Sequence, residues 1–142
     1  MISLLPILLR IAGGGLILLA LLHIPIGRKL RWSEDSRNLT PVNAAVFQVH
    51  TFFICLVLGL MGLPCLMEPA VFLTPTRAGT WVSWSFATFW AIRLYCQWFV
   101  YAPGLWQSKR LETLVHTGFT LMWTALTALF SACGAVQMGW IR

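Results

Sequence analysis

Five polar side chains within long, mainly apolar stretches are the residues of this chain best suited to chemistry. They are His23, His50, Arg93, Gln97 and His116. Neutral imidazoles bind zinc, copper or iron, and two of them on facing helices can ligate haem. Arginine and glutamine donate hydrogen bonds to carbonyl or anionic ligands. The residue types therefore allow two kinds of site: a metal or haem site at His23, His50 and His116, or a quinone or lipid-headgroup site at His50, Arg93, Gln97 and His116.

The spacing of these residues does not decide between the two kinds of site. The three histidines come from three different apolar stretches, and no H-x-x-x-H pair places two of them on one helix face. A third interpretation needs no ligand: histidines near the membrane surface bond to water and carbonyl groups, and Arg93 extends towards the surface or joins two helices. This third interpretation is favoured over the two kinds of ligand site.

Arg93 is the most demanding of the five residues. An unpaired charge at the centre of a membrane helix costs about 2.5–3.5 kcal/mol on the gentler insertion scales, so Arg93 should face other helices and have partners. Gln97, four residues further on, lies on the same helix face. The acidic residues of the chain all lie at or beyond the ends of the apolar stretches: Glu34, Asp35, Glu68 and Glu112. The counter-charge therefore comes from a folded-back loop or from outside the chain.

The five residues lie on predicted membrane helices. Of the 142 residues, 58% are hydrophobic and 10% are charged, whereas soluble domains have about 25% charged residues. A membrane span needs about 20 apolar residues. Four stretches meet this requirement, near residues 4–26, 43–67, 81–102 and 113–140. The sequence predicts an all-α integral membrane four-helix bundle, with residues 1–142 in a single transmembrane domain.

Proline, glycine and threonine mark the predicted helix ends. Pro25 and Gly27 are expected to end the first helix. Thr40 is a suitable cap for the second helix, because Pro41 follows it at the first helical position. Between these ends, residues 32–39 are expected to form a short helix at the membrane surface with Ser33 as its cap. Glycines within the first two spans predict close contact between helices: Gly13, Gly14, Gly15, Gly59 and Gly62.

Basic residues indicate how the chain is oriented. The first and third connections between spans hold Arg28, Lys29, Arg31, Arg37, Lys109 and Arg110, whereas the opposite side has Arg77 and Arg142. The positive-inside rule then puts both termini on the non-cytoplasmic side of the inner (cytoplasmic) membrane. The same loops account for the net charge of +6 and fit attraction to anionic lipid headgroups. No nucleic-acid partner is expected, because these charges do not form a basic helix or a stacking platform.

The missing residue types exclude several classes of activity. There is no C-x-x-C pair for thiol redox chemistry and no carboxylate inside a span. The sequence therefore favours a non-catalytic subunit or scaffold of a membrane assembly, whose partners are the lipid bilayer and other membrane subunits or further copies of itself. One alternative is a redox protein that binds haem, a metal ion or quinone at the His/Arg/Gln cluster. A further alternative is a proton-linked transporter.

Several residues, taken in their order along the chain, also resemble the sequences of a group of proteins. The residues are Trp32, Glu34, Leu39, Pro41, Asn43, Val49, His50, Phe89, Trp90, Arg93, Leu94, Gln97, His116 and Thr120. In this order they resemble a group of small uncharacterised bacterial membrane proteins with four spans, and the likeness covers nearly the whole chain. The resemblance implies a four-span architecture and draws attention to His50, Arg93, Gln97 and His116. It implies no activity, because none is established for the group.

Overall fold

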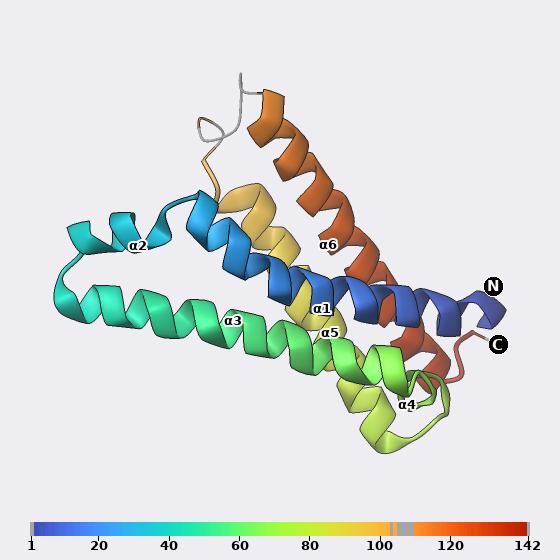
Figure 1. Cartoon of the computed structure of the whole chain (residues 1–142). Coiled ribbons are helices and arrows are strands. Elements are labelled where there is room, and N and C mark those ends of the chain that lie inside the picture. Colours follow the sequence, from blue (N-terminus) through green and yellow to red (C-terminus); the bar gives the residue numbers. More distant parts are fainter. Residues whose placement is uncertain (1, 103, 105–109, 142) are drawn as a thin grey trace. The chain divides into compact units, whose positions relative to one another are not determined.

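The computed structural model describes residues 2–102, 104 and 110–141, and within this part of the chain all regular structure is helical (Figure 1). The elements are η1 (Ile2–Leu4), α1 (Leu5–Lys29), α2 (Trp32–Asp35), η2 (Ser36–Asn38), α3 (Pro41–Met67), α4 (Ala70–Leu73), α5 (Arg77–Phe99) and α6 (Arg110–Gln137). The all-α fold class is therefore confirmed. Lys109 and Arg142, which enter the predicted orientation, lie outside the described residues.

Three of the described helices are long and apolar enough to cross a membrane, namely α1, α3 and α6. They have 25, 27 and 28 residues, and at 1.5 Å per residue each is longer than the hydrocarbon core of about 30 Å. This is the expected property of a multi-pass membrane protein.

The third predicted span forms the helix α5, which is less apolar than the other three. It has 23 residues and carries Arg77, Arg93 and Gln97 among several hydroxyl and indole side chains. These side chains lower the hydropathy of α5, because each contains a polar atom that is costly to move from water into apolar surroundings. Helix formation over residues 81–102 is thus confirmed in most of its length, and the crossing of the membrane by α5 stays a prediction.

The contacts within the chain divide it into two compact units. We call Leu9–Pro69 the α1–α3 unit, and we call Met1–Leu8 together with Ala70–Arg142 the α4–α6 unit. The first contains most of α1 with α2, η2 and α3. The second contains α4, α5 and α6.

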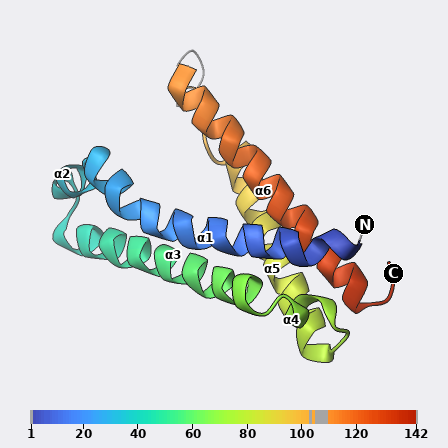
Figure 2. The same cartoon turned by 45° about the vertical axis from the view of Figure 1, so that its right-hand side comes forward.

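In the α1–α3 unit, α1 and α3 run side by side in opposite directions and are joined through α2 and η2 (Figures 1 and 2). Gly13 and Gly62 lie where the two backbones approach. A Cβ atom on Gly13 would stand 2.6 Å from the Gly62 carbonyl oxygen, and one on Gly62 would stand 2.8 Å from the Gly13 carbonyl oxygen. Only glycine fits at this contact. By contrast, nothing lies within 4 Å of a Cβ placed on Gly14, Gly15 or Gly59.

The helix ends in this unit follow the sequence in one case and depart from it in another. Thr40 caps α3 as predicted, since its hydroxyl oxygen accepts a hydrogen bond from the Asn43 backbone N–H at 3.4 Å. The prediction that Pro25 and Gly27 end the first helix is wrong, because α1 continues through both to Lys29. A proline removes one backbone donor, and in a helix this long the neighbouring bonds keep the helix intact. The short predicted helix appears as α2 and η2, and its cap is Arg31, at φ 53°, in place of Ser33.

In the α4–α6 unit, α5 packs along α6 and the short α4 contacts both. Gln137 joins the three helices at one end of this unit. Its Oε1 accepts a hydrogen bond from the Thr76 backbone N–H at 2.8 Å, and its Nε2 donates to the Val71 carbonyl oxygen at 3.1 Å. Gly79 leaves room for this side chain, because a Cβ there would stand 2.5 Å from Gln137 Nε2. The other end of the α5–α6 pair holds three of the polar residues singled out in the sequence, namely Arg93, Gln97 and His116.

Candidate functional site

The side chain of Gln97 is the centre of a polar cluster between α5 and α6. It is 5% exposed. Its Nε2 lies 2.8 Å from Nδ1 of His116, and its Oε1 accepts from Nε1 of Trp123 and from Nη1 of Arg93, each at 3.3 Å. The amide therefore links one residue of its own helix to two residues of α6. We call Arg93, Gln97, His116 and Trp123 the Gln97 cluster.

The donor and acceptor roles in the Gln97 cluster follow from its chemistry. The indole and guanidinium N–H groups can only donate, so the amide oxygen must face Trp123 and Arg93. The amide nitrogen then faces His116, and because an NH₂ group only donates, Nδ1 of His116 accepts the bond. A neutral His116 thus carries its proton on Nε2. The network fixes both the side-chain orientation and the tautomer of this histidine.

Aromatic rings surround the Gln97 cluster. Trp123 stacks on Trp90 of α5, with ring centroids 4.9 Å apart and an angle of 12°, and on Phe119 of α6, at 5.4 Å and 11°. Trp90 and Trp123 are both buried. The Arg93 guanidinium carbon lies 5.0 Å from the centroid of the Trp123 ring and 5.6 Å from that of Tyr101. Both distances are within the range of cation–π attraction.

Sequence reasoning missed Trp90 and Trp123 as partners of the polar residues. Trp90, Leu94 and Gln97 are all buried, and their spacing of four and three residues places them on one helix face. This spacing could have identified the face of α5 that packs inward. It could not have identified Trp123, because the sequence does not say which residues of α6 lie opposite that face.

The charge of Arg93 is not neutralised by a carboxylate in the part of the chain that the structure describes. There the one ion pair joins Arg31 to Glu34, at 3.5 Å, far along the sequence from Arg93. The Arg93 side chain is partly exposed. Its hydrogen bond to Gln97 Oε1 and its ring contacts are interactions with neutral groups, so the cluster has a net positive charge.

His23 and His50 lie in the α1–α3 unit, and each bonds to its own helix. Nδ1 of His23 is 2.7 Å from the Leu19 carbonyl oxygen, and Nδ1 of His50 is 2.9 Å from that of Val46. A carbonyl only accepts, so both histidines carry a proton on Nδ1. His50 is exposed, and the His23 ring also contacts the edge of the Trp32 ring, at 6.4 Å. The structure thus joins Arg93, Gln97 and His116, and it gives His23 and His50 local partners.

The metal prediction for His23, His50 and His116 concerns three histidines on three helices. Within residues 2–102, 104 and 110–141, no group of three or more His, Cys, Asp or Glu side chains is arranged to hold a metal ion. The geometry around His116 is that of a hydrogen-bonded interhelical residue.

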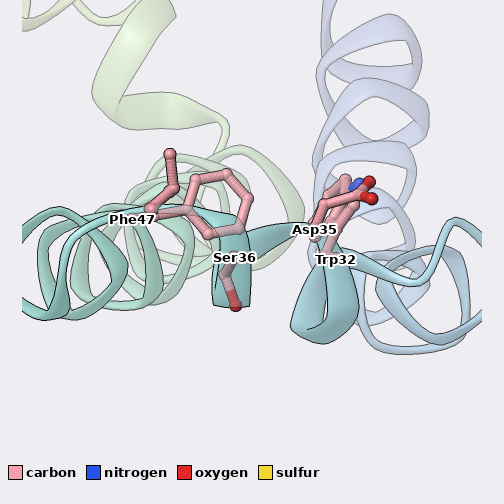
Figure 3. Close-up of a pocket in the computed structure, with 5 residues that line it drawn as sticks. Trp32, Asp35, Ser36 and Phe47 are labelled. Carbon is pink, nitrogen blue, oxygen red and sulfur yellow. The ribbon is translucent and has the colours of Figure 1, made fainter.

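A second feature is a hollow of about 280 Å³ in the α1–α3 unit, lined by Trp32, Asp35, Ser36, Leu39 and Phe47 (Figure 3). The Trp32 ring meets the Phe47 ring edge to face, at 6.0 Å. The Ser36 hydroxyl already donates to the Ser33 carbonyl oxygen, at 3.0 Å. The hollow therefore offers mainly apolar surface, and the candidate site with polar chemistry is the Gln97 cluster.

Comparison with known proteins finds no family model that matches the chain and no curated protein or solved structure with significant similarity.

Proposed function

We propose that this protein is a multi-pass inner-membrane protein in which α5 is a fourth span, with both termini on the non-cytoplasmic side. We further propose that it acts without catalysis, as a small subunit or scaffold of a membrane assembly. The proposed non-catalytic role is supported by the contacts of Gln97. Both polar atoms of its side-chain amide bind residues of the α5–α6 pair. Gln97 thus serves to hold α5 and α6 together, through His116 and Trp123.

The surface of α5 supports its assignment as a span. Its large apolar and aromatic side chains are widely exposed in this chain, among them Trp81, Phe89, Ile92, Trp98 and Phe99. Its polar residue Gln97 is buried and hydrogen-bonded. Membrane helices have this arrangement, because lipid accepts apolar side chains whereas polar groups must find partners within the protein.

Reporter fusions at two positions test the fourth span. One alkaline phosphatase fusion is placed after Thr74, between α4 and α5, and the other after Gly104, between α5 and α6. If α5 crosses the membrane, the Thr74 fusion is active and the Gly104 fusion is inactive, with the opposite result for a cytoplasmic reporter. Equal activity at the two positions would contradict the fourth span.

Purification in a mild detergent tests the role in an assembly. The protein is taken from its native membrane and examined by native mass spectrometry, by its optical spectrum and by elemental analysis. We expect a defined complex heavier than the chain mass of 16.0 kDa, without a Soret band or a stoichiometric metal. A monomer in every mild detergent would contradict the subunit role. A haem or metal lost on His116→Ala would instead establish the redox alternative.

A further inference from the structure

We propose that Arg93 binds a phosphoryl oxyanion at the membrane surface, beside Gln97 and Tyr101. The inference rests on the proposed span α5, since the guanidinium must lie near a membrane face. It does not depend on whether the protein is a subunit of an assembly. Two sources can supply the ligand: the phosphate of a lipid headgroup, or free phosphate.

The charge of Arg93 is uncompensated in the described residues. Arg93 carries a fixed positive charge, and in the described part of the chain it has no carboxylate partner. Its contacts are the neutral amide oxygen of Gln97 and the rings of Trp123 and Tyr101. Such contacts orient a cation without cancelling its charge. An anion bound from outside the chain would neutralise it.

The Arg93 side chain extends towards the C-terminal end of α5. The groups that Arg93 contacts on its own segment, Gln97 and Tyr101, lie four and eight positions further along the chain. Tyr101 is already beyond the end of α5 at Phe99. The backbone of Arg93 is about 9 Å from that end, at 1.5 Å per residue. The side chain thus runs towards the helix end and carries its charge to the surface, as long basic side chains do in membranes.

Most of the N–H donors of Arg93 have no hydrogen-bond partner in the described residues. A guanidinium has five N–H groups in one plane, arranged to fit two oxygens of a phosphate. In the described residues, the hydrogen bond to Gln97 Oε1 uses one of them. The Trp123 and Tyr101 rings lie 5.0 and 5.6 Å from the guanidinium carbon and restrict how this plane can turn. The remaining donors are therefore held in a limited range of orientations, which favours binding of a planar pair of acceptor oxygens.

Arg93 is better matched by an anionic ligand than by a neutral one. A neutral quinone carbonyl could accept a hydrogen bond from Arg93, but it would leave the charge uncompensated. A phosphoryl group supplies both the acceptor oxygens and the negative charge. Phosphates of lipid headgroups are abundant at the membrane surface. The chemistry of Arg93 thus favours a phosphoryl oxyanion.

The experiment measures lipid binding by the full chain in detergent micelles, by native mass spectrometry. Phosphatidylglycerol is titrated into wild-type protein, Arg93→Ala and the control Arg77→Ala. Each variant loses one positive charge from α5, and Arg77 is an exposed residue at the other end of that helix. We expect Arg93→Ala to weaken binding about tenfold or more, since hydrogen bonds to charged groups are individually strong. Arg77→Ala should bind like the wild type.

Inorganic phosphate separates the two sources of the ligand. If millimolar phosphate displaces phosphatidylglycerol from the wild type and this competition is lost in Arg93→Ala, the site recognises the free anion. If phosphate does not displace the lipid while Arg93→Ala still loses it, the site recognises the headgroup. Both results support a phosphoryl site. Equal lipid and phosphate binding by wild type, Arg93→Ala and Arg77→Ala would overturn it.

A second variant guards against misfolding of Arg93→Ala, which circular dichroism would reveal. Arg93→Lys keeps the charge but replaces the planar fork by a single ammonium group. We expect it to bind phosphatidylglycerol about threefold more weakly than the wild type, and unchanged binding would count against the site. The fusions after Thr74 and Gly104 test separately whether α5 crosses the membrane. A result against the span can therefore be distinguished from a result against the binding site.

Discussion

Gln97 of α5 and His116 of α6 are joined by a hydrogen bond of 2.8 Å between the amide Nε2 and the imidazole Nδ1. The bond connects α5 to α6 through two residues that are 19 positions apart in the sequence. It also settles which ring nitrogen of a neutral His116 carries the proton, because the amide oxygen is occupied by the donors of Trp123 and Arg93. The buried amide of Gln97 thus sets the hydrogen-bonding roles of Arg93, His116 and Trp123.

Gln97→Leu should destabilise the α5–α6 pair. The substitution keeps much of the side-chain volume but removes the acceptor for Trp123 Nε1 and the donor to His116 Nδ1. Interhelical hydrogen bonds in membrane proteins contribute about 0.6–2 kcal/mol, so we expect the free energy of unfolding in mixed micelles to fall by about 1–2 kcal/mol. Gln48→Leu is the control, because Gln48 is exposed on α3. Equal effects of the two substitutions would argue against the interhelical role.

Gly79→Ala should disrupt the contact that Gln137 makes with α4 and α5. The added Cβ would stand 2.5 Å from Gln137 Nε2 and 2.6 Å from the Val71 carbonyl oxygen. Since one of these atoms belongs to the backbone, we expect a loss of about 1–3 kcal/mol in the free energy of unfolding. Gly118→Ala is the matched control in α6, because nothing lies within 4 Å of a Cβ there. It should be neutral or stabilising, since alanine favours helix more than glycine does.

The sequence predicted most of the helices and part of the cluster. Hydropathy located the helices within a few residues, and the spacing of Arg93 and Gln97 correctly placed them on one face. The sequence could not show that His116 joins them while His50 bonds to its own helix, because periodicity gives the face of each helix and not its neighbour. The effect of Pro25 was also misjudged, since the strength of a helix breaker depends on the bonds around it.

Gly62→Ala should loosen the contact between α1 and α3. Its Cβ would stand 2.8 Å from the Gly13 carbonyl oxygen and 3.0 Å from a side-chain carbon of Ile17, so the two helices must move apart. We expect a lower thermal midpoint in detergent and faster proteolysis of the connection between the helices. Gly59→Ala adds the same methyl group three residues earlier, where nothing lies within 4 Å. A similar loss in both variants would show that the effect comes from the glycine-to-alanine change itself and not from the helix contact.

Ser83→Ala should leave stability unchanged or raise it. Ser83 of α5 is fully buried, and its hydroxyl oxygen has no hydrogen-bond partner in the described part of the chain. Removing an unpaired buried polar atom ends its desolvation cost, so we expect a gain of up to about 1 kcal/mol in the free energy of unfolding. Ser85→Ala, at an exposed position two residues further on, is the control and should have no effect. If Ser83→Ala alone loses stability, the Ser83 hydroxyl is bound in the membrane by a water, a lipid or a partner subunit. That result would place a further polar contact on the inward face of α5.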